Sequence, residues 1–399
     1  MSSYFDQLAM RESYGNMKWM VTPREVTMQD GITFCGAEMD FRTAPPVIEA
    51  LVKRAQNGLY GYTLADEHYL AAVVGWMKRR RAWDIRQDWI IPTNGTLHSI
   101  ATAIRAFTKP GDGVIIHNPV YMLYERMISN NGRTIVRNEL LYRNGSYDMD
   151  FAELERLMAD PQNKMFILCN PHNPIAKVWN DSYLKELLRL ARKHQVMVIS
   201  DEIFAEIVFD GHRTTPLLQH ADLEDDVIVL TSIGKSFNFT GFSHANAIIA
   251  KEELRSKFNE QKRIDHYGSL NPFIRDAVIA AYTEGDTWFD EMLQYVAGNI
   301  SYVQQFLQQH MPSIQMTRME GTYLAWMDWS ALDLSEQELQ HFLLVEAGLD
   351  LDQGASFGSM GRGFTRMNLA TPRKELVLAL ERLKQALQAR TITYKGEAK

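Results

Sequence analysis

The sequence predicts an α/β protein in which a mostly parallel sheet, covered by helices on both faces, forms a large domain beside a smaller α+β domain. The first observation is that short apolar runs alternate with helix-period segments between about Asp88 and Ala250. Runs that are apolar throughout are typical of parallel strands buried on both faces. The second is a change of character after about residue 285, where a long helical segment is followed by polar–apolar alternation. The third is the length of 399 residues, which accommodates two or three domains.

The predicted elements of the large domain follow one another regularly. A helix over residues 96–107 ends at Lys109-Pro110-Gly111, a sequence that stops helices. After it come a strand at 113–118, a helix at 151–160 capped by Asp148 or Asp150, a strand at 164–170, a helix at 182–194, and strands at 196–203 and 226–233. Strands that alternate with helices in this way are what a parallel sheet with crossover helices requires.

The small domain is predicted from the C-terminal pattern. Its elements are a helix at 287–310, an alternating strand at 322–329, a helix at 336–348, a strand at 364–369 and a final helix from residue 374. The first 45 residues show no pattern of a separate domain and could pack against this smaller domain. We therefore expect residues 46–284 to form the large domain and residues 1–45 with 285–399 to form the small one. An active site is expected in the cleft between them.

Composition excludes several classes of protein. Hydrophobic residues make up 46% and charged residues 23% of the chain, as in a globular protein rather than a disordered or fibrous one. The 42 Lys and Arg against 49 Asp and Glu give a net charge of −7, which argues against nucleic-acid binding. We interpret the basic run Lys78–Arg81 as the solvated end of a helix.

The expected location follows from the cysteines and from the apolar runs. Cys35 and Cys169 are too few for a disulfide framework and fit a reducing compartment. The N-terminus lacks the pattern of a signal peptide, and no stretch approaches the roughly 18 consecutive apolar residues of a membrane span. We therefore expect a cytoplasmic protein without a membrane partner.

Polar residues stand where predicted strands end, which is where open α/β sheets bind ligands. Asp201-Glu202 follows one strand, and a buried carboxylate is costly unless it meets a cation. Ser232-Ile233-Gly234-Lys235 follows the next, where burial could lower the pKa of the lysine. Taken alone, each has a plainer interpretation, which is a helix N-cap for Asp201 and a surface loop for Lys235.

Two turns complete this set. The segment NPHNPIAKVW, residues 170–179, forces a turn after its strand, and a tight connection would explain it equally well. Thr93-Asn94-Gly95-Thr96 precedes a helix whose N-terminus would suit a phosphate, although this signal is weak alone. The patterns GxxxxGK[ST], GxGxxG, HExxH and CxxC are absent, so neither a nucleotide cradle nor a metal site is predicted.

Together the four features fit the chemistry of pyridoxal phosphate. This cofactor needs a lysine for its aldehyde, an acid that keeps its ring nitrogen protonated, and a helix N-terminus for its phosphate. A substrate carboxylate needs a guanidinium group, which an arginine far downstream would supply.

The motifs AEMDFRTAPPV, YGYT, NPVY, LCNPHNP, SDEI, KSFN, EGTYLAW, GASFG and FTRMNLATPR occur in this order. On them the chain resembles the fold-type I pyridoxal-phosphate enzymes of the class I/II aminotransferase family, whose fold is that of aspartate aminotransferase. Within the family it is most similar to the cystathionine β-lyases, or carbon–sulfur lyases, of the MalY/PatB type. The resemblance runs from about Trp19 to about Leu387.

The resemblance implies roles for the predicted residues. Lys235 matches the Schiff-base lysine, which also moves the Cα proton, and Asp201 matches the partner of the ring nitrogen. Asn173 would donate a hydrogen bond to the ring O3′, and Tyr121 would stack on the ring, unless it is simply a core tyrosine. The residues implied to bind the phosphate are Gly95, Thr96 and Ser232.

Two further residues carry implications for the substrate and for assembly. Arg366 matches the arginine that binds the substrate carboxylate, and an ordinary salt bridge is the alternative. Tyr62, in YGYT, would reach the phosphate of the neighbouring subunit. The resemblance thus implies an amino-acid substrate and a homodimer with shared active sites.

The chain departs from the family pattern in four places. Phe204 stands where a Tyr or His usually donates to O3′, so we expect a raised pKa of the Schiff base. Ser243 replaces an Arg or Lys on the phosphate, so we expect weaker cofactor retention, with His244 as a candidate substitute. Ile175-Ala176 replaces Thr-Gly or Gly-Gly, which predicts a different turn, and Thr96-Leu97 replaces Val-Val.

Three functions fit this sequence. The favoured one is β-elimination from an amino acid with sulfur on Cβ, which gives pyruvate, ammonia and a thiol. The alternative is an aminotransferase, which uses the same Lys235, Asp201 and Arg366 but needs an oxo-acid acceptor. The third is a cofactor-binding regulatory protein, against which these three intact residues argue. The preference for elimination rests on resemblance alone.

Overall fold

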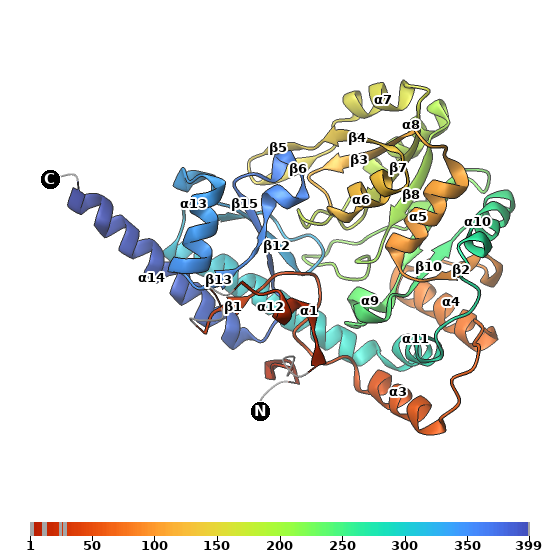
Figure 1. Cartoon of the computed structure of the whole chain (residues 1–399), viewed down its shortest axis with the longest axis horizontal. Coiled ribbons are helices and arrows are strands. Elements are labelled where there is room, and N and C mark those ends of the chain that lie inside the picture. Colours follow the sequence, from red (N-terminus) through yellow and green to blue (C-terminus); the bar gives the residue numbers. More distant parts are fainter. Residues whose placement is uncertain (1–3, 10–13, 24–25, 27–29, 398–399) are drawn as a thin grey trace.

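A seven-stranded sheet organises the larger part of the molecule (Figure 1). The computed structural model describes residues 4–9, 14–23, 26 and 30–397. The sheet order is β2 (Ile90–Thr93), β10 (Ala245–Ile248), β9 (Val227–Thr231), β8 (Met197–Asp201), β7 (Asn163–Cys169), β3 (Gly113–Asn118) and β4 (Thr134–Glu139). Strand β10 runs antiparallel to its neighbours β2 and β9, and the other neighbouring pairs are parallel. The predicted mostly parallel sheet is confirmed.

The sheet separates two apolar cores. In β3, Val114 and Ile116 face one core and Ile115 faces the other, as the alternation of side chains along a strand requires. One core is covered by α5 (Thr96–Phe107), α6 (Leu123–Asn130) and α10 (Glu252–Ile264). The other is covered by α4 (Glu67–Arg81), α7 (Phe151–Ala159), α8 (Asp181–His194) and α11 (Pro272–Glu284). Helices on both faces explain why these strands are apolar throughout.

The predicted helices and strands of this part match the structure within one or two residues at most ends. Of the two candidate caps for α7, Asp148 and Asp150, the N-cap is Asp150. Its carboxylate accepts a hydrogen bond of 3.0 Å from the backbone N–H of Glu153. Several elements were not predicted: the strands β2, β4 and β10, the helices α6, α10 and α11, helix α3 (Pro45–Asn57), the short α1 (Met17–Met20) and the β5–β6 hairpin (Leu141–Arg143 and Ser146–Asp148).

The smaller part is built on an antiparallel sheet in the order β11 (Gln315–Met316), β12 (Leu324–Asp328), β15 (Phe364–Asn368) and β14 (Asp352–Gln353). Its helices are α12 (Asp286–His310), α14 (Arg373–Glu397) and α13 (Glu336–His341), which continues as a π-helical turn over Phe342–Glu346. The predicted helix at 336–348 is therefore regular only in its first half.

The N-terminal segment joins the smaller part. Strand β1 (Ile32–Thr33) pairs in parallel with β13 (Leu349–Asp350), more than 300 positions away in the sequence. This pairing supports the division of the chain at residues 45 and 285, which stays a prediction. None of the helices within the described residues is long and apolar enough to cross a membrane.

The interpretation of Lys78–Arg81 as a solvated helix end is wrong for its last member. The run does end α4, but Arg81 is only 2% exposed and its Nη2 donates to the carboxylate of Glu202. The other carboxylate oxygen of Glu202 accepts hydrogen bonds from Ser200 Oγ at 2.8 Å and from the backbone of Leu217 at 3.0 Å. The cation is buried because it neutralises a carboxylate that follows Asp201.

This pair predicts a large stability difference between two arginine variants. Arg81→Ala leaves Glu202 charged and buried, so we expect the free energy of unfolding to fall by about 3–5 kcal/mol in a denaturant titration. The control is Arg86→Ala, which breaks an exposed pair with Asp88 and should cost less than about 1 kcal/mol. Equal losses in the two variants would contradict this account.

Candidate active site

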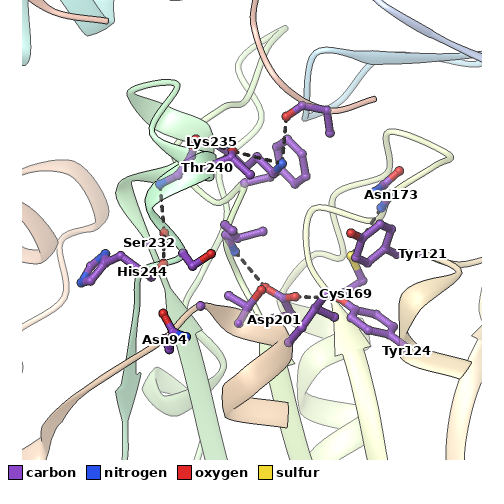
Figure 2. Close-up of a pocket in the computed structure, with 18 residues that line it drawn as sticks. Asn94, Tyr121, Tyr124, Cys169, Asn173, Asp201, Ser232, Lys235, Thr240 and His244 are labelled. Carbon is purple, nitrogen blue, oxygen red and sulfur yellow. Dashed lines mark hydrogen bonds between the residues drawn. The ribbon is translucent and has the colours of Figure 1, made fainter. Parts of the chain in front are cut away.

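A cavity of about 190 Å³ opens at the carboxyl ends of the central parallel strands (Figure 2). It lies where the sheet rules place ligands, beside the ends of β7, β8 and β9 and the start of α5. The structure brings together around it the predicted site residues Gly95, Thr96, Tyr121, Asn173, Asp201, Ser232 and Lys235. Arg366 and Tyr62 are the predicted residues that do not line it.

One end of the cavity is formed by the N-terminus of α5. Gly95 is the N-cap and has a φ of +92°, a conformation that glycine adopts at little cost. No side chain of the helix caps the first turn, although Gly95, Thr96 and Leu97 all line the cavity. The first backbone N–H groups of α5 therefore suit an anion.

Ser232 and His244 stand beside this helix end. The hydroxyl of Ser232 donates to the carbonyl of His244 at 2.5 Å and accepts from the backbone of Gly234 at 2.9 Å. The His244 ring points away from the other labelled side chains (Figure 2) and its Nε2 is 2.7 Å from the hydroxyl of Tyr69. Burial lowers the pKa of His244 to about 3, so the ring is neutral and does not replace the missing cation at Ser243.

Asp201 ends β8 and is only 3% exposed. Its Oδ2 accepts a hydrogen bond of 2.8 Å from the hydroxyl of Tyr124, and its Oδ1 one of 3.3 Å from the backbone of Ile203. Burial raises the pKa of Asp201 to about 6, although both hydrogen bonds and Lys235 oppose this shift. A turn rather than a helix follows Asp201, so it is not a helix N-cap.

Lys235 lies on the other side of the cavity, in the one-turn helix α9 (Ile233–Ser236) (Figure 2). Its Nζ donates to the carbonyl of Ala37 at 2.8 Å, and the Thr240 hydroxyl oxygen is 3.4 Å away. Burial, with a contribution from Arg366, lowers the pKa of Lys235 to about 8. The amine therefore loses its proton more readily than a surface lysine, as a nucleophile or general base must.

Arg366, in the middle of β15, is only 3% exposed and adjoins the cavity through Asn173. Its Nε and Nη2 donate to one carboxylate oxygen of Asp352 at 3.0 and 2.5 Å, and its Nη1 donates to Asn173 Oδ1 at 2.8 Å. The guanidinium carbon is 4.7 Å from the ring centre of Phe357. Arg366 does form a salt bridge, but a buried one that orients its remaining N–H groups.

The two predicted tyrosines differ in position. Tyr121 follows β3 and lines the cavity, with its ring edge-on to that of Tyr124 at 5.6 Å. Tyr62 lies between α3 and α4 and is fully exposed. Tyr62 does not line the cavity of its own chain. Its contact with the phosphate of a neighbouring subunit stays a prediction.

The turn at Ile175-Ala176, where the chain departs from the family pattern, contains a residue in the left-handed conformation. Ala176 has a φ of +57°, and its carbonyl accepts hydrogen bonds of 3.0 Å from the backbones of Glu320 and Gly321. The conformation costs about 1 kcal/mol or more for a residue with a Cβ. These two hydrogen bonds attach the turn to the smaller part of the molecule, and whether the turn differs from that of the family stays a prediction.

Sequence reasoning missed several residues of the site. Tyr124 lies in the first turn of α6, three positions after Tyr121, which precedes the helix, and this short spacing was the available signal. Asp352 had no signal, because only the pairing of β14 with β15 places it opposite Arg366. The remaining unpredicted lining residues include Ala37, Asn94, Cys169 and Thr240.

Comparisons with known proteins agree with this geometry. Cystathionine beta-lyase PatB of Bacillus subtilis (strain 168) is 36% identical over 385 residues, which cover 96% of this chain and 99% of that protein. A pyridoxal-phosphate-bound protein of Clostridium difficile 630, provisionally described as an aminotransferase, has a TM-score of 0.92 at 34% identity, covering 96% of this chain and 99% of the other. Cystalysin from Treponema denticola, whose structure contains pyridoxal 5′-phosphate, has a TM-score of 0.90 at 34% identity, covering 98% and 100%. The model of the class I and II aminotransferases matches residues 29–383, and the chain belongs to that family.

Proposed function

We propose that this chain is a pyridoxal-phosphate-dependent carbon–sulfur β-lyase, which cleaves an amino acid with sulfur on Cβ to pyruvate, ammonia and a thiol. The observation that carries the proposal is a buried carboxylate and a half-buried amine of lowered pKa on opposite sides of one cavity, with an uncapped helix N-terminus at its end. The names of the full-length relatives, cystathionine beta-lyase PatB among them, support the reaction type.

The residues of the cavity fit pyridoxal phosphate. When bound, this cofactor supplies an aldehyde that combines with amines and a ring that accepts the electron pair of a broken Cα–H bond. A cationic ring nitrogen would offset the burial of Asp201. The N-terminus of α5 would hold the phosphate, with Ser232 beside it, and Tyr121 would cover the ring face.

The side chains of this site divide the work of elimination. Lys235, with its lowered pKa, takes the proton from the substrate Cα and can return a proton to the departing sulfur. The Cβ–S bond breaks as the thiol leaves, and water then releases pyruvate and ammonia. Arg366 binds the substrate carboxylate through the N–H groups that Asp352 and Asn173 leave available, which fixes the Cα–H bond relative to Lys235.

An aminotransferase is the second candidate, favoured by the description of the solved structure from Clostridium difficile 630. It would use Lys235, Asp201 and Arg366 in the same way up to removal of the Cα proton. The proton would then be returned to the cofactor side, and no bond to Cβ would break. The need for an oxo-acid acceptor distinguishes this reaction from elimination.

We also propose a homodimer in the cytoplasm. The fully exposed Tyr62 and the exposed apolar side chains around it, Leu59, Tyr60 and Leu64, support a partner surface at this loop. The two free cysteines support a reducing compartment. In the dimer, Tyr62 would contact the cofactor phosphate bound by the other subunit.

The proposal predicts the products of one simple reaction. Purified protein with pyridoxal phosphate and L-cystathionine, without any oxo acid, should release pyruvate, ammonia and a free thiol over many turnovers. Lys235→Ala should abolish all three, whereas Lys251→Ala, which removes a surface ion pair with Asp226, should leave them unchanged. A single turnover that converts the cofactor to its amine form, without pyruvate, would establish the aminotransferase instead.

Phe204 predicts an altered titration of the bound cofactor. Its ring is 3% exposed, and Lys235 Nζ lies 5.8 Å from the ring centre, so no side-chain donor stands here for O3′. Phe204→Tyr would add a donor that stabilises the deprotonated cofactor, and should lower the pKa of its visible band. The control Phe306→Tyr, on α12, should leave that pKa unchanged. A wild-type pKa no higher than that of Phe204→Tyr would refute the prediction.

Asp201 predicts a pH-dependent stability of the cofactor-free protein. Because folding raises the pKa of Asp201 to about 6, this carboxyl contributes stability at low pH that is lost as the pH rises through that value. Asp201→Asn cannot ionise and so does not lose this stability as the pH rises. Above about pH 7 the cofactor-free variant should therefore be more stable than the wild type, by at most about 3 kcal/mol. Melting temperatures at acidic and neutral pH test this, and a variant that is less stable at neutral pH would contradict it. Added cofactor should reverse the order.

A further inference from the structure

We propose that Tyr124 is a positioning residue, whose hydroxyl keeps the Asp201 carboxylate ionised and turned toward the cofactor ring nitrogen. This inference rests on the proposed function, since it concerns the acid that would pair with that ring. Tyr124 lines the cavity, and it acts on the cofactor through Asp201.

The geometry ties Tyr124 to Asp201 and to the stacking tyrosine. Tyr124 lies in the first turn of α6, is 1% exposed, and its hydroxyl donates to Asp201 Oδ2 at 2.8 Å (Figure 2). Its backbone N–H donates to the carbonyl of Tyr121 at 3.1 Å, and the two rings meet edge to face. One short segment of chain therefore sets both the ring that covers the cofactor and the hydroxyl that holds its acid.

A hydroxyl at this depth needs a hydrogen-bond partner. A phenylalanine would fill the same apolar space, and an unpaired phenolic hydroxyl would cost about 1–3 kcal/mol. The pKa of Tyr124 is raised well above its ordinary value by burial and by Asp201, so the hydroxyl keeps its proton and acts as a donor. Tyr124 is the only side chain that donates to Asp201 among the described residues.

The other groups around Asp201 do not provide the same effect. Lys235 favours the ionised carboxylate, but this amine must also change its own charge during the reaction. Glu202, the next residue along the strand, disfavours the ionised form. The thiol of Cys169, opposite Asp201 on β7, is neutral because burial raises its pKa to about 12, and its Sγ donates to the carbonyl of Pro171.

A fixed neutral donor at the carboxylate has a specific chemical consequence. Asp201 and the cofactor ring nitrogen would share one proton, which goes to the more basic of the two atoms. A hydrogen bond to the carboxylate lowers its basicity and so leaves the proton on the ring nitrogen. The protonated ring accepts electrons more readily, which assists removal of the Cα proton by Lys235.

The test is Tyr124→Phe, with Tyr147→Phe as the matched control. Tyr147 is also buried, at 2% exposed, and its hydroxyl accepts a hydrogen bond from Trp326 Nε1 at 3.0 Å, away from the cavity. Each variant removes one buried hydroxyl and orphans one partner. Both are reconstituted with pyridoxal phosphate labelled with ¹⁵N in the ring, and the ring-nitrogen resonance of the holoenzyme is recorded.

A second measurement keeps the test independent of turnover. The affinity of the cofactor-free proteins for pyridoxamine phosphate, which forms no covalent bond with Lys235, is measured against pH. In the wild type it should fall as the pH drops through the pKa of Asp201, because the neutral acid no longer attracts the ring. Tyr124→Phe should move this midpoint upward by about one pH unit or more, and Tyr147→Phe should not move it.

The outcomes separate this inference from the proposed function. We expect a protonated ring nitrogen in the wild type and in Tyr147→Phe, and a resonance displaced toward the unprotonated position in Tyr124→Phe. An unchanged resonance and midpoint in Tyr124→Phe would overturn the inference, as would equal changes in the two variants. A wild-type protein that binds neither form of the cofactor would overturn the proposed function itself.

Discussion

The site depends on a buried carboxylate, that of Asp201, with which no cation among the described residues forms a salt bridge. Asp201 and Lys235 follow two neighbouring parallel strands, and the pairing of β8 with β9 sets Asp201 beside Leu230. They lie on opposite sides of the cavity (Figure 2) and form no ion pair, so each only weakly opposes the burial that shifts both pKa values toward neutrality. In the proposed function this cost has a purpose, because the ionised carboxylate would bind a cationic ring nitrogen and the amine an aldehyde. The N-terminus of α5 and the two tyrosines Tyr121 and Tyr124 line the same cavity as these two residues, and Arg366 adjoins it through Asn173.

The surroundings of Asp201 and Arg366 show how the fold accommodates buried charged groups at the site. Asp201, the last residue of β8, lines the cavity, whereas Glu202, which follows the strand, pairs with Arg81 at the end of α4. Glu202 pairs with the buried Arg81, although it still contributes to the raised pKa of Asp201. On the substrate side, Asp352 and Asn173 hold Arg366. Of these groups only Asn173 comes from the large sheet's own connections; Arg366 and Asp352 come from the smaller part. The groups that hold Arg366 therefore meet only where the two parts of the chain pack together.

The sequence predicted the features that local chemistry determines. The strands β3, β7, β8 and β9 and the helices α5, α7 and α8 were found because they carry clear periodicity and stop signals. Lys235, Asp201 and Gly95 were found because they follow strands or begin a helix. Residues that act through tertiary contacts were missed: Tyr124 and Asp352 reach their partners only through packing, and Arg81 was interpreted as solvated because nothing local indicates its pairing with Glu202. The choice of elimination over transamination came from resemblance, since both reactions use the same side chains.

Lys235 is proposed to be the amine that receives the cofactor in this cavity. The most direct measurement is borohydride reduction of the protein after incubation with pyridoxal phosphate, followed by proteolysis and mass spectrometry. The account predicts a reduced phosphopyridoxyl group on the peptide that contains Lys235, in a yield approaching one per chain, and its loss in Asp201→Asn or at a pH where the cofactor no longer binds. A label spread over surface lysines, or concentrated on another residue, would contradict the account.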